Sequence, residues 1–417
     1  MPKVLMIAYH FPPVGFSSGV HRSLKFTQYL PENGWDPVVL TVNPGAFERV
    51  DDSQLKDVPA SVPVIRAFAF DCARHFAVAG RYPGFLALPD RWSSWWLSGV
   101  LAGLRAIKKY KPEVIWSTYP IATAHLIGFT LHKLTGIPWV SDFRDSMTEA
   151  DYPVDARKRK VFRWIEKKAV YNSSKVIFTT PGAVRMYANR YPDISSKCWQ
   201  IIENGYDEEK FQEVEQVVPS SAGPCGEIEK VTLVHSGLLY PSERDPRCFF
   251  QAIAALKTDG VISADNLRII LRASGHEEFY SPIINNLSID DIVELAPPVS
   301  YGEALKEMLE VEGLLLFQAS ACNHQIPAKV YEYIRSRKPV FAMTDKSGDT
   351  ASVLLDAGLT SIVSLDSIDS IKEGLKEFVC SIIECRANVA DDLAVERHSR
   401  KHKVRELSKI FDSLIVK

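Results

Sequence analysis

The sequence predicts an α/β protein made of two Rossmann-like, doubly wound domains, and three observations support this fold class. Short apolar runs alternate with segments of helical periodicity along the whole chain. The 417 residues exceed one ordinary core, at roughly 150 residues per domain. A polar stretch rich in proline and small residues interrupts the alternation near the middle. We therefore expect two domains that face each other across a cleft, with a ligand at the carboxyl ends of their strands.

The first domain is predicted to span residues 1–205. Short apolar runs bounded by turn residues are typical of parallel strands buried on both faces. Such runs lie at 4–8, 37–42, 114–117, 139–141 and 176–179. Apolar residues spaced by three and four predict helices between them, over 23–29, 92–109 and 122–134.

A second series of strands and helices follows the polar stretch. We expect a linker over 206–230 and a second domain over 231–395. Its predicted strands lie at 232–235, 267–271, 292–295, 314–317 and 340–343. The final segment, 396–417, is a basic helix with no strand after it, and we expect it to pack at the domain junction.

The net charge of −2 hides two unequal halves. Residues 1–200 contain 26 Lys and Arg against 16 Asp and Glu, and residues 201–417 contain 23 against 35. The sum excludes a wholly basic protein, so no nucleic-acid partner is expected.

Composition also bounds the cellular location. No run of about 18 apolar residues is present, and the apolar stretch near the N-terminus is too short for a signal-peptide core. None of the seven cysteines has the CxxC spacing of a zinc site. We expect a cytoplasmic protein without a metal or other cofactor.

The first strand runs into a glycine-containing turn that leads to a helix. Glycines here let backbone amides approach a phosphate, so Gly15 is a candidate phosphate contact, and His10 in the same turn is a second candidate site residue. An ordinary turn is the alternative for Gly15. The sequence GxGxxG is absent and no acid follows the second strand, which makes a nicotinamide enzyme a poor match.

A charged segment, Ser141-Asp142-Phe143-Arg144-Asp145, follows a strand introduced by Gly-Ile-Pro. Charges at the carboxyl end of a strand lie where an α/β domain meets its ligand. Asp142 is a candidate for accepting a proton from an attacking hydroxyl, and Arg144 for meeting a phosphate. The alternative is an internal Arg–Asp pair that caps the next helix.

Two segments of the second half contain bases beside helix starts. Gly237 follows a strand and precedes Arg244, while Ile-Pro-Ala-Lys-Val-Tyr-Glu opens a helix that contains Lys329 and Glu332. The two bases and the helix amides can neutralise a diphosphate, and Glu332 can accept hydrogen bonds from ribose. The alternative is a surface pair between Lys329 and Glu332. No DxD pair is present, which agrees with phosphate binding without metal.

An ordered set of motifs resembles a bacterial glycosyltransferase family 4 enzyme. They are YHFPPVG followed by GVHR, GWDPVVLT, STYPIATAH, GIPWVSDFRD, ENGYD, HSGLLY and IPAKVYEYIRSRKPV. The resemblance covers nearly the whole chain. It implies a GT-B fold, a nucleotide-sugar donor held mainly by the C-terminal domain, an acceptor held mainly by the N-terminal domain, and retention of anomeric configuration.

The resemblance also implies roles for particular residues. Glu332 matches the second glutamate of the family's E-x7-E motif, whose first glutamate falls at His324, and Arg244 matches the base that meets the diphosphate. The arginine that often follows the strand glycine is Leu238 here, which shifts more of the diphosphate charge onto Arg244 and Lys329. The expected catalytic residues are Arg244, Lys329 and Asp142. The donor is expected at Gly15, Gly237, His324, Ala328 and Glu332, and the acceptor at His10, Arg144 and Asp145.

The function expected from these features is a retaining hexosyl- or N-acetylhexosaminyltransferase. It would use a nucleotide-sugar, UDP-linked by preference, to build a cell-surface polysaccharide or glycolipid on a glycan or polyprenyl-linked acceptor. Alternatives are a sugar-nucleotide epimerase of the same fold, or a non-catalytic relative that binds nucleotide-sugars, which the lost glutamate at His324 suggests.

A basic cluster in the first half points to an anionic membrane surface. The segment RKRKVFRWIEKK, residues 157–168, contains seven bases and one acid, and an apolar stripe with tryptophans precedes it over 92–107. Basic clusters with interfacial tryptophans attract anionic lipid. Ordinary core packing and a solvated helix face are the alternatives. The expected location is the inner face of the plasma membrane.

Overall fold

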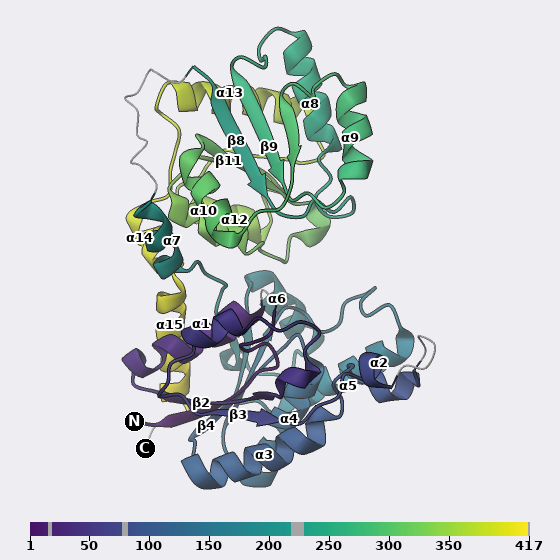
Figure 1. Cartoon of the computed structure of the whole chain (residues 1–417), viewed down its shortest axis with the longest axis vertical. Coiled ribbons are helices and arrows are strands. Elements are labelled where there is room, and N and C mark those ends of the chain that lie inside the picture. Colours follow the sequence, from purple (N-terminus) through teal and green to yellow (C-terminus); the bar gives the residue numbers. More distant parts are fainter. Residues whose placement is uncertain (16–18, 77–81, 218–228, 416–417) are drawn as a thin grey trace. The chain divides into compact units, whose positions relative to one another are not determined.

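The computed structural model describes residues 1–15, 19–76, 82–217 and 229–415, and divides into two compact units. Unit 1 comprises Met1–Asn204 and Arg400–Lys417, and unit 2 comprises Gly205–Ser399. The second unit therefore includes a helix, α7 (Glu208–Glu215), within the segment that the sequence predicts as linker. Figure 1 shows both units as α/β layers.

Unit 1 contains a seven-stranded parallel sheet in the order β3-β2-β1-β4-β5-β6-β7. Its strands are β1 (Lys3–Ile7), β2 (Asp36–Val42), β3 (Val64–Ala67), β4 (Val114–Thr118), β5 (Trp139–Arg144), β6 (Lys175–Phe178) and β7 (Trp199–Ile201). Its α-helices are α1 (Gly19–Tyr29), α2 (Cys72–His75), α3 (Trp95–Tyr110), α4 (Ala122–Thr135), α5 (Ala156–Asn172), α6 (Pro181–Arg190) and α15 (Arg400–Asp412). Short 3₁₀ turns lie at Pro31–Asn33, Pro44–Ala46, Asp52–Asp57, Gly84–Ala87 and Ser196–Cys198.

Unit 2 contains a six-stranded parallel sheet in the order β10-β9-β8-β11-β12-β13. Its strands are β8 (Val231–Ser236), β9 (Leu267–Arg272), β10 (Val293–Ala296), β11 (Gly313–Phe317), β12 (Val340–Met343) and β13 (Ile362–Val363). Besides α7, its helices are α8 (Arg247–Thr258), α9 (Glu277–Asn286), α10 (Tyr301–Glu310), α11 (Lys329–Ser336), α12 (Asp349–Asp356), α13 (Ile368–Ile383) and α14 (Asp392–Arg397), with a 3₁₀ turn at Ser320–Cys322. The predicted fold class is confirmed.

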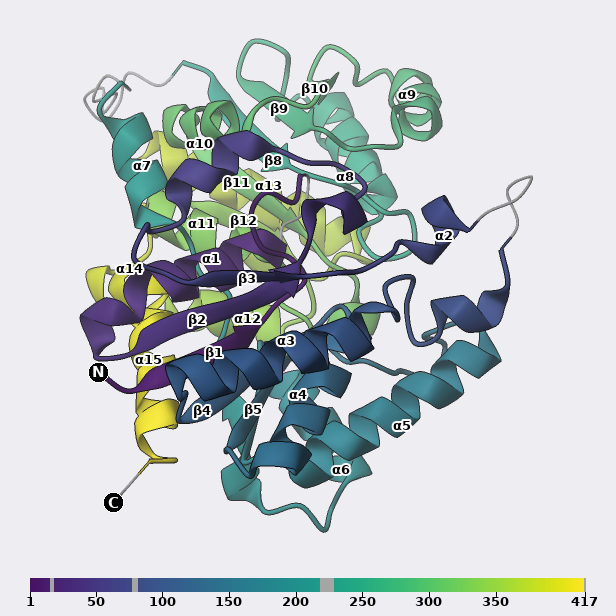
Figure 2. The ribbon, with the colours of Figure 1, turned by 60° about the horizontal axis from the view of Figure 1, so that its bottom comes forward.

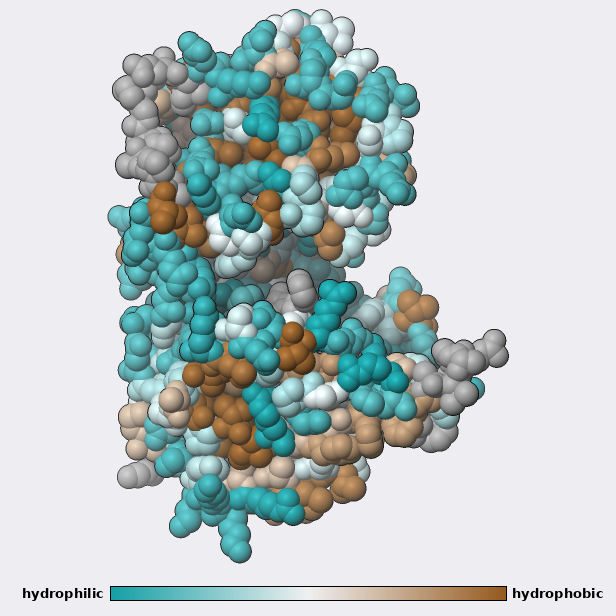
Figure 3. Space-filling view, in the orientation of Figure 1, coloured by the Kyte–Doolittle hydropathy of each residue, from teal (hydrophilic) through white to brown (hydrophobic). Residues whose placement is uncertain are grey.

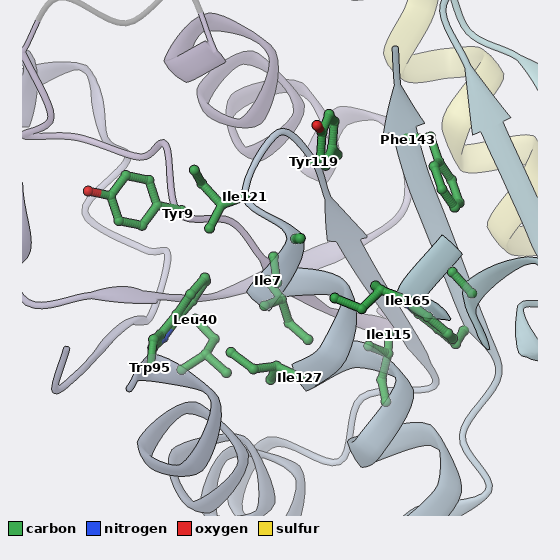
Figure 4. Packing of buried hydrophobic residues seen from close by; sticks show 14 of the residues in the cluster. Ile7, Tyr9, Leu40, Trp95, Ile115, Tyr119, Ile121, Ile127, Phe143 and Ile165 are labelled. Carbon is green, nitrogen blue, oxygen red and sulfur yellow. The ribbon is translucent and has the colours of Figure 1, made fainter. Parts of the chain in front are cut away.

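Each sheet is buried on both faces, because its strand residues alternate between two cores. In β1, Leu5 and Ile7 belong to the core under α3, α4 and α5, whereas Val4 and Met6 belong to the core under α1 and α15. Figure 4 shows Ile7 and Ile115 of the sheet close to Ile127 of α4. This two-sided burial explains why the strands read as continuous apolar runs in the sequence.

The last helix, α15, packs on unit 1 although it follows unit 2 in the chain. Its apolar residues Val404, Leu407 and Phe411 are fully buried in the core that α1 shares. The buried side chains of this segment lie within the core of unit 1, and its packing at the domain junction stays a prediction. Figure 2 shows α15 near α1, and α3, α4 and α5 together.

The surface of unit 1 also includes one sheet edge. Strand β3 ends the sheet, and its Val64 and Ile65 are only partly buried. In Figure 3 apolar side chains gather on the near face of unit 1, where β2 and β3 lie. None of the helices within the described ranges has the length and apolar character needed to cross a bilayer.

Candidate functional site

The strand order of unit 2 reverses between β8 and β11, the position where open α/β sheets bind ligands. Strand β8 ends at Ser236 and is followed by Gly237, and β11 ends at Phe317. Helix α11 begins at Lys329, one of the residues predicted from the sequence. The candidate donor site is therefore the carboxyl edge of β8 and β11 together with the start of α11.

Lys329 lies against the end of β8. Its Nζ donates to Nε2 of His235 at 3.0 Å and to the carbonyl oxygen of Ser236 at 2.5 Å. His235 is fully buried and lies 2.9 Å from the carbonyl oxygen of Leu315 through Nδ1. Since a carbonyl oxygen can only accept, Nδ1 carries the proton and Nε2 accepts from the lysine. Two strands therefore fix the position of one ammonium group.

The positive charge of the Lys329 ammonium group has no negatively charged hydrogen-bond partner. Burial, together with the positive charge of Arg244, lowers the pKa of Lys329 to about 7, while Glu332 acts in the opposite direction. Burial and the charge of Lys329 hold the pKa of His235 well below its ordinary value, so this imidazole is neutral. The partners that hold Lys329 thus add no negative charge.

Arg244 adds a second cation to this edge. Its Nη1 donates to the carbonyl oxygen of Leu238 at 3.1 Å, and its guanidinium lies 5.8 Å from the ring centre of Tyr240. Among the described residues, no carboxylate oxygen lies within 4.0 Å of the nitrogens of Arg244 or Lys329. The alternative of a surface pair between Lys329 and Glu332 is therefore not what the structure contains.

The backbone conformation at position 237 and the nearby side chain of Lys329 both require a glycine there. Its φ of 116° lies in the left-handed region, and a Cβ there would lie 3.0 Å from Nζ of Lys329. The hydroxyl of Ser236 beside it is buried, with no hydrogen-bond partner among the described residues. A buried hydroxyl without a partner beside two uncompensated cations is typical of a polar ligand site.

The remaining predicted donor residues lie around the start of α11. Glu332 is half-buried and accepts from the hydroxyl of Tyr301 at 2.8 Å. His324 precedes the helix, with Nε2 3.4 Å from the side-chain nitrogen of Gln325, and Ala328 is exposed directly before the first helical residue. Gly15 differs from expectation: its amide already donates to the carbonyl oxygen of Arg49 at 2.9 Å, so it is not free to bind a phosphate.

The sheet of unit 1 reverses its strand order between β1 and β4, and charged residues predicted from the sequence lie at this carboxyl edge. Asp142 is fully buried there. Its Oδ2 accepts from Nε of Arg22 at 2.8 Å and its Oδ1 from Nη2 at 3.3 Å. Arg22 also donates to the carbonyl oxygens of Ile202 and Glu203. Because both oxygens of Asp142 hold Arg22, Asp142 is not placed to orient an acceptor hydroxyl, which corrects its predicted role.

Arg144 and His10 are arranged differently from the pair beside them. The φ of Arg144 is 61°, and its Nε is buried without a hydrogen-bond partner among the described residues. Burial and the charge of Arg144 lower the pKa of His10 to about 4, so His10 is neutral near pH 7. A Cβ on Gly19 would lie 2.7 Å from Nδ1 of His10 and 3.1 Å from Nη1 of Arg144. These two side chains therefore converge on the start of α1.

Asp145 is an exposed carboxylate at the same edge. Its Oδ1 lies 3.5 Å from the hydroxyl of Thr179, which also donates to the carbonyl oxygen of Arg144. Desolvation by the surrounding protein raises the pKa of Asp145, and the charge of Arg144 opposes this. Asp145, unlike Asp142, keeps an oxygen that a ligand can reach.

Three residues at these edges have no role assigned from the sequence. They are Arg22, which holds Asp142, His235, which holds Lys329, and Tyr301, which holds Glu332. Each of these residues lies within one of the family-like motifs or at the start of a helix that follows a strand. That position is the sequence feature that could have indicated a functional role. Their partners lie far away in the sequence, so spacing could not identify them.

A cavity of unit 2 lies near this edge but is lined by other residues. Among the residues that the structure describes, no three His, Cys, Asp or Glu side chains are grouped to hold a metal ion. A cavity of about 550 Å³ lies farther along the edge of unit 2, at the ends of β11, β12 and β13, with Gln318, Asp345 and Ser364 in its lining. None of the residues predicted for the donor lines this cavity.

Comparison with known proteins gives a family-model match to part of the chain and a shared fold over its whole length. Residues 19–195 match the family model described as "Glycosyl transferase 4-like domain". No curated protein matches the chain. The chain is similar to the structure of sucrose-phosphate synthase from Thermosynechococcus elongatus, with 12% identity, a TM-score of 0.63 and coverage of 99% of both chains.

Two other solved structures extend the comparison. HepE from Anabaena, in complex with UDP-glucose, is 13% identical, with a TM-score of 0.57 and coverage of 99% of both chains. A putative UDP-N-acetylglucosamine 2-epimerase from Listeria monocytogenes is 10% identical, with a TM-score of 0.57 and coverage of 99% of this chain and 96% of the other. At these identities the likeness shows a shared fold.

Proposed function

Starting from a chain that carries a glycosyl transferase 4-like domain over residues 19–195 and has the GT-B fold, we propose that it transfers a sugar from a nucleotide-sugar to an acceptor. The main observation in support of this proposal is the pair of cations Lys329 and Arg244 at the end of β8. Neither has a carboxylate partner among the described residues, and Lys329 is held in place by neutral groups. A diphosphate supplies the negative charge that this edge lacks.

The chemistry of the proposed reaction follows from this charge. As the bond between sugar and diphosphate breaks, negative charge grows on the leaving phosphate oxygen. Lys329 and Arg244 stabilise that charge without needing to reorganise, because His235 and the carbonyl oxygens of Ser236 and Leu238 already fix them. Glu332 accepts hydrogen bonds from ribose, with Tyr301 holding one of its oxygens.

The finer assignments extend the family resemblance. We propose a UDP-linked hexose or N-acetylhexosamine as donor, retention of configuration, and a product that belongs to a cell-surface polysaccharide or glycolipid. The complex of HepE with UDP-glucose supports UDP as the nucleotide. His324, which stands at the position of the first family glutamate, is the group proposed to contact the donor sugar, as a hydrogen-bonding side chain in place of a carboxylate.

Nucleotide binding tests the proposal directly. UDP-, GDP- and ADP-sugars are screened by thermal shift, where a ligand at 100 times its dissociation constant stabilises by about 2.7 kcal/mol. Lys329→Met should abolish most of the shift and lower turnover by about 10²–10³, as loss of one such donor does. Lys376→Met, at an exposed position on α13, is the matched control and should behave as the wild type. No shift with any nucleotide, or an unchanged shift in Lys329→Met, would overturn the assignment.

Two alternatives are decided by product analysis. An epimerase of the same fold is represented by the Listeria monocytogenes structure, and it would return an isomerised donor without an acceptor. A relative without catalysis would show a thermal shift but no product. Transfer of labelled sugar to an acceptor, with release of nucleoside diphosphate, identifies the proposed activity.

We also propose that unit 1 binds an anionic membrane surface through α5 and α3. On α5, Trp164 is 51% exposed, and the ammonium of Lys168 lies 5.9 Å from its ring. On α3, Trp95 is buried in the core, but Leu97 is 62% exposed. Basic groups beside exposed apolar side chains suit a headgroup layer. The tryptophan stripe expected from the sequence is therefore divided between the core and the surface.

A vesicle assay checks the membrane proposal. The protein should sediment with vesicles that contain phosphatidylglycerol but not with phosphatidylcholine alone, and 0.5 M salt should weaken binding, because screening acts on exposed charges. The double variant Arg157→Glu, Lys160→Glu changes two exposed bases of α5 and should bind at least tenfold more weakly. Lys376→Glu in unit 2 serves as the control for a charge reversal elsewhere. Equal binding to both vesicle types would contradict the proposal.

A further inference from the structure

Arg144 combines two energetic costs at one position. Its φ of 61° places a bulky side chain in the left-handed region, where few residues other than glycine occur. Its guanidinium makes no hydrogen bond or ion pair with a described residue, although Nε is buried. A desolvated cation without a partner is strongly unfavourable. Strain and an unsatisfied charge at the carboxyl edge of a sheet indicate a group that a ligand completes.

The neighbours of Arg144 do not neutralise it. Asp142 is committed to Arg22, which binds both of its carboxylate oxygens. His10 is neutral near pH 7, because burial and Arg144 itself lower its pKa to about 4. Asp145 attracts Arg144 electrostatically from more than 4.0 Å away and forms no ion pair with it.

Glycine at the start of α1 lets two polar side chains approach the helix closely. A side chain at Gly19 would meet both His10 and Arg144, so the lack of a Cβ allows these two side chains to converge there. Asp145 is exposed beside Arg144 and can accept from a hydroxyl. An unpaired guanidinium, a neutral imidazole and one accessible carboxylate together suit a ligand that contains an oxyanion next to a hydroxyl.

We infer that the acceptor contains an oxyanionic group, a phosphate ester or a carboxylate, which Arg144 binds through paired N–H donors while Asp145 accepts from a nearby hydroxyl. The identification of this ligand as the acceptor rests on the proposed transfer reaction. The binding of the oxyanion concerns unit 1 alone. A planar guanidinium matches both oxyanion classes in two-point geometry. A neutral sugar would leave Arg144 uncompensated.

Calorimetric titration tests this inference with the donor site first saturated by UDP. The probes are methyl phosphate, glucuronate and the neutral methyl glucoside. The wild type should bind at least one of the anionic probes at least tenfold more tightly than methyl glucoside. Arg144→Gln should lose at least tenfold in affinity for that probe, whereas Arg105→Gln, at an exposed arginine on α3, should lose none. Equal affinities for charged and neutral probes, or equal affinities in wild type and Arg144→Gln, would overturn the inference.

Two further measurements distinguish ligand binding by Arg144 from a purely structural role. Without ligand, Arg144→Gln should melt at the wild-type temperature or above it, because the substitution removes an unpaired buried charge; a lower melting temperature would count against the inference. Arg144→Lys keeps the charge and should retain part of the affinity for the anionic probe. If UDP produces no thermal shift but the Arg144-dependent binding persists, the proposed function fails and the oxyanion site remains.

Discussion

Lys329, at the start of α11, has an ammonium group whose protonation changes near neutral pH. Its ammonium donates to a neutral imidazole and to a carbonyl oxygen, and the strongest charge acting on it is another cation, Arg244. In water the same lysine would keep a pKa of about 10.4. The protein therefore holds a base close to its titration point at the place where a diphosphate is proposed to bind.

The pH dependence of nucleotide binding should report this directly. Affinity should be full below about pH 7 and fall as the pH rises through this value, because only protonated Lys329 attracts a diphosphate. Above the pKa the charged fraction falls at most about tenfold per pH unit. Titration calorimetry between pH 6 and 9 measures the change, and Lys329→Met should give a flatter profile. A wild-type affinity that is constant over this range would contradict the prediction.

The free energy of unfolding of the ligand-free protein should increase as the pH rises, whereas the affinity for nucleotide should decrease. The folded pKa of Lys329 lies below its unfolded value, so the unfolded chain binds more protons between about pH 7 and 10. The destabilisation caused by burying this charge is therefore full below about pH 7 and is relieved as the pH rises above it. Urea unfolding of wild type and Lys329→Met at pH 7 and 9 isolates this contribution as the difference between the two proteins. An identical pH dependence in both would argue against it.

Among the helices, α1 links the first strand to the proposed acceptor edge. Its N-terminal residue, Gly19, lies against His10 and Arg144, and its Arg22 binds Asp142 on β5. The helix therefore aligns two charged groups that lie more than a hundred residues away from it in the chain. The sequence motif GVHR at this helix start has its explanation in these contacts.

Replacing Gly19 by alanine should disturb this alignment. A Cβ would lie 2.7 Å from a ring nitrogen of His10, closer than real side-chain contacts, so His10 must move and Arg144 with it. We expect weaker binding of methyl phosphate, by about tenfold, with unchanged UDP binding. Gly302→Ala on α10 is the matched control, because a Cβ there would meet no atom within 4 Å, and it should stabilise by up to about 1 kcal/mol. Unchanged binding in Gly19→Ala would argue against the role of this edge.

Some elements leave no clear signal in the sequence because they are short. Strands β3, β7 and β13 contain four, three and two residues, and no pattern in the sequence predicts them. Each lies at an edge of its sheet, where pairing with one neighbour replaces the long apolar run of a central strand. The central strands are all predicted, because burial on both faces leaves a signal in every residue.

The chain as a whole returns to its first unit at the end. Helix α15 buries Val404, Leu407 and Phe411 against the sheet of unit 1. Nε1 of Trp35 donates to Oδ1 of Asp412 at 2.9 Å, and Lys403 pairs with Glu203 at 3.0 Å. Unit 1 therefore depends on a helix that the chain reaches only after completing unit 2.

Truncation after Ser399 should destabilise unit 1. Each large apolar side chain of α15 contributes about 2 kcal/mol by burial, so loss of the helix removes several such increments. Urea unfolding followed by tryptophan fluorescence should show a transition at lower denaturant in the truncated chain. Lys409→Ala, at an exposed position on the same helix, should leave the free energy of unfolding within about 0.5 kcal/mol of wild type. An unchanged transition after truncation would contradict this dependence.

Local patterns along the chain already predict the two parallel sheets, their central strands, and the positions of Lys329, Arg244 and Arg144 at strand or helix ends. Such features are readable because periodicity and turn residues report burial and chain direction within a few positions. The folded chain adds that Arg22 takes Asp142, that His235 holds Lys329, and that α15 completes unit 1. These contacts join residues separated by 94 to 120 positions, or by a whole unit. Such contacts decide which charged side chains have a partner within the protein, as Asp142 has in Arg22, and which do not, as with Arg144. No local sequence pattern predicts them.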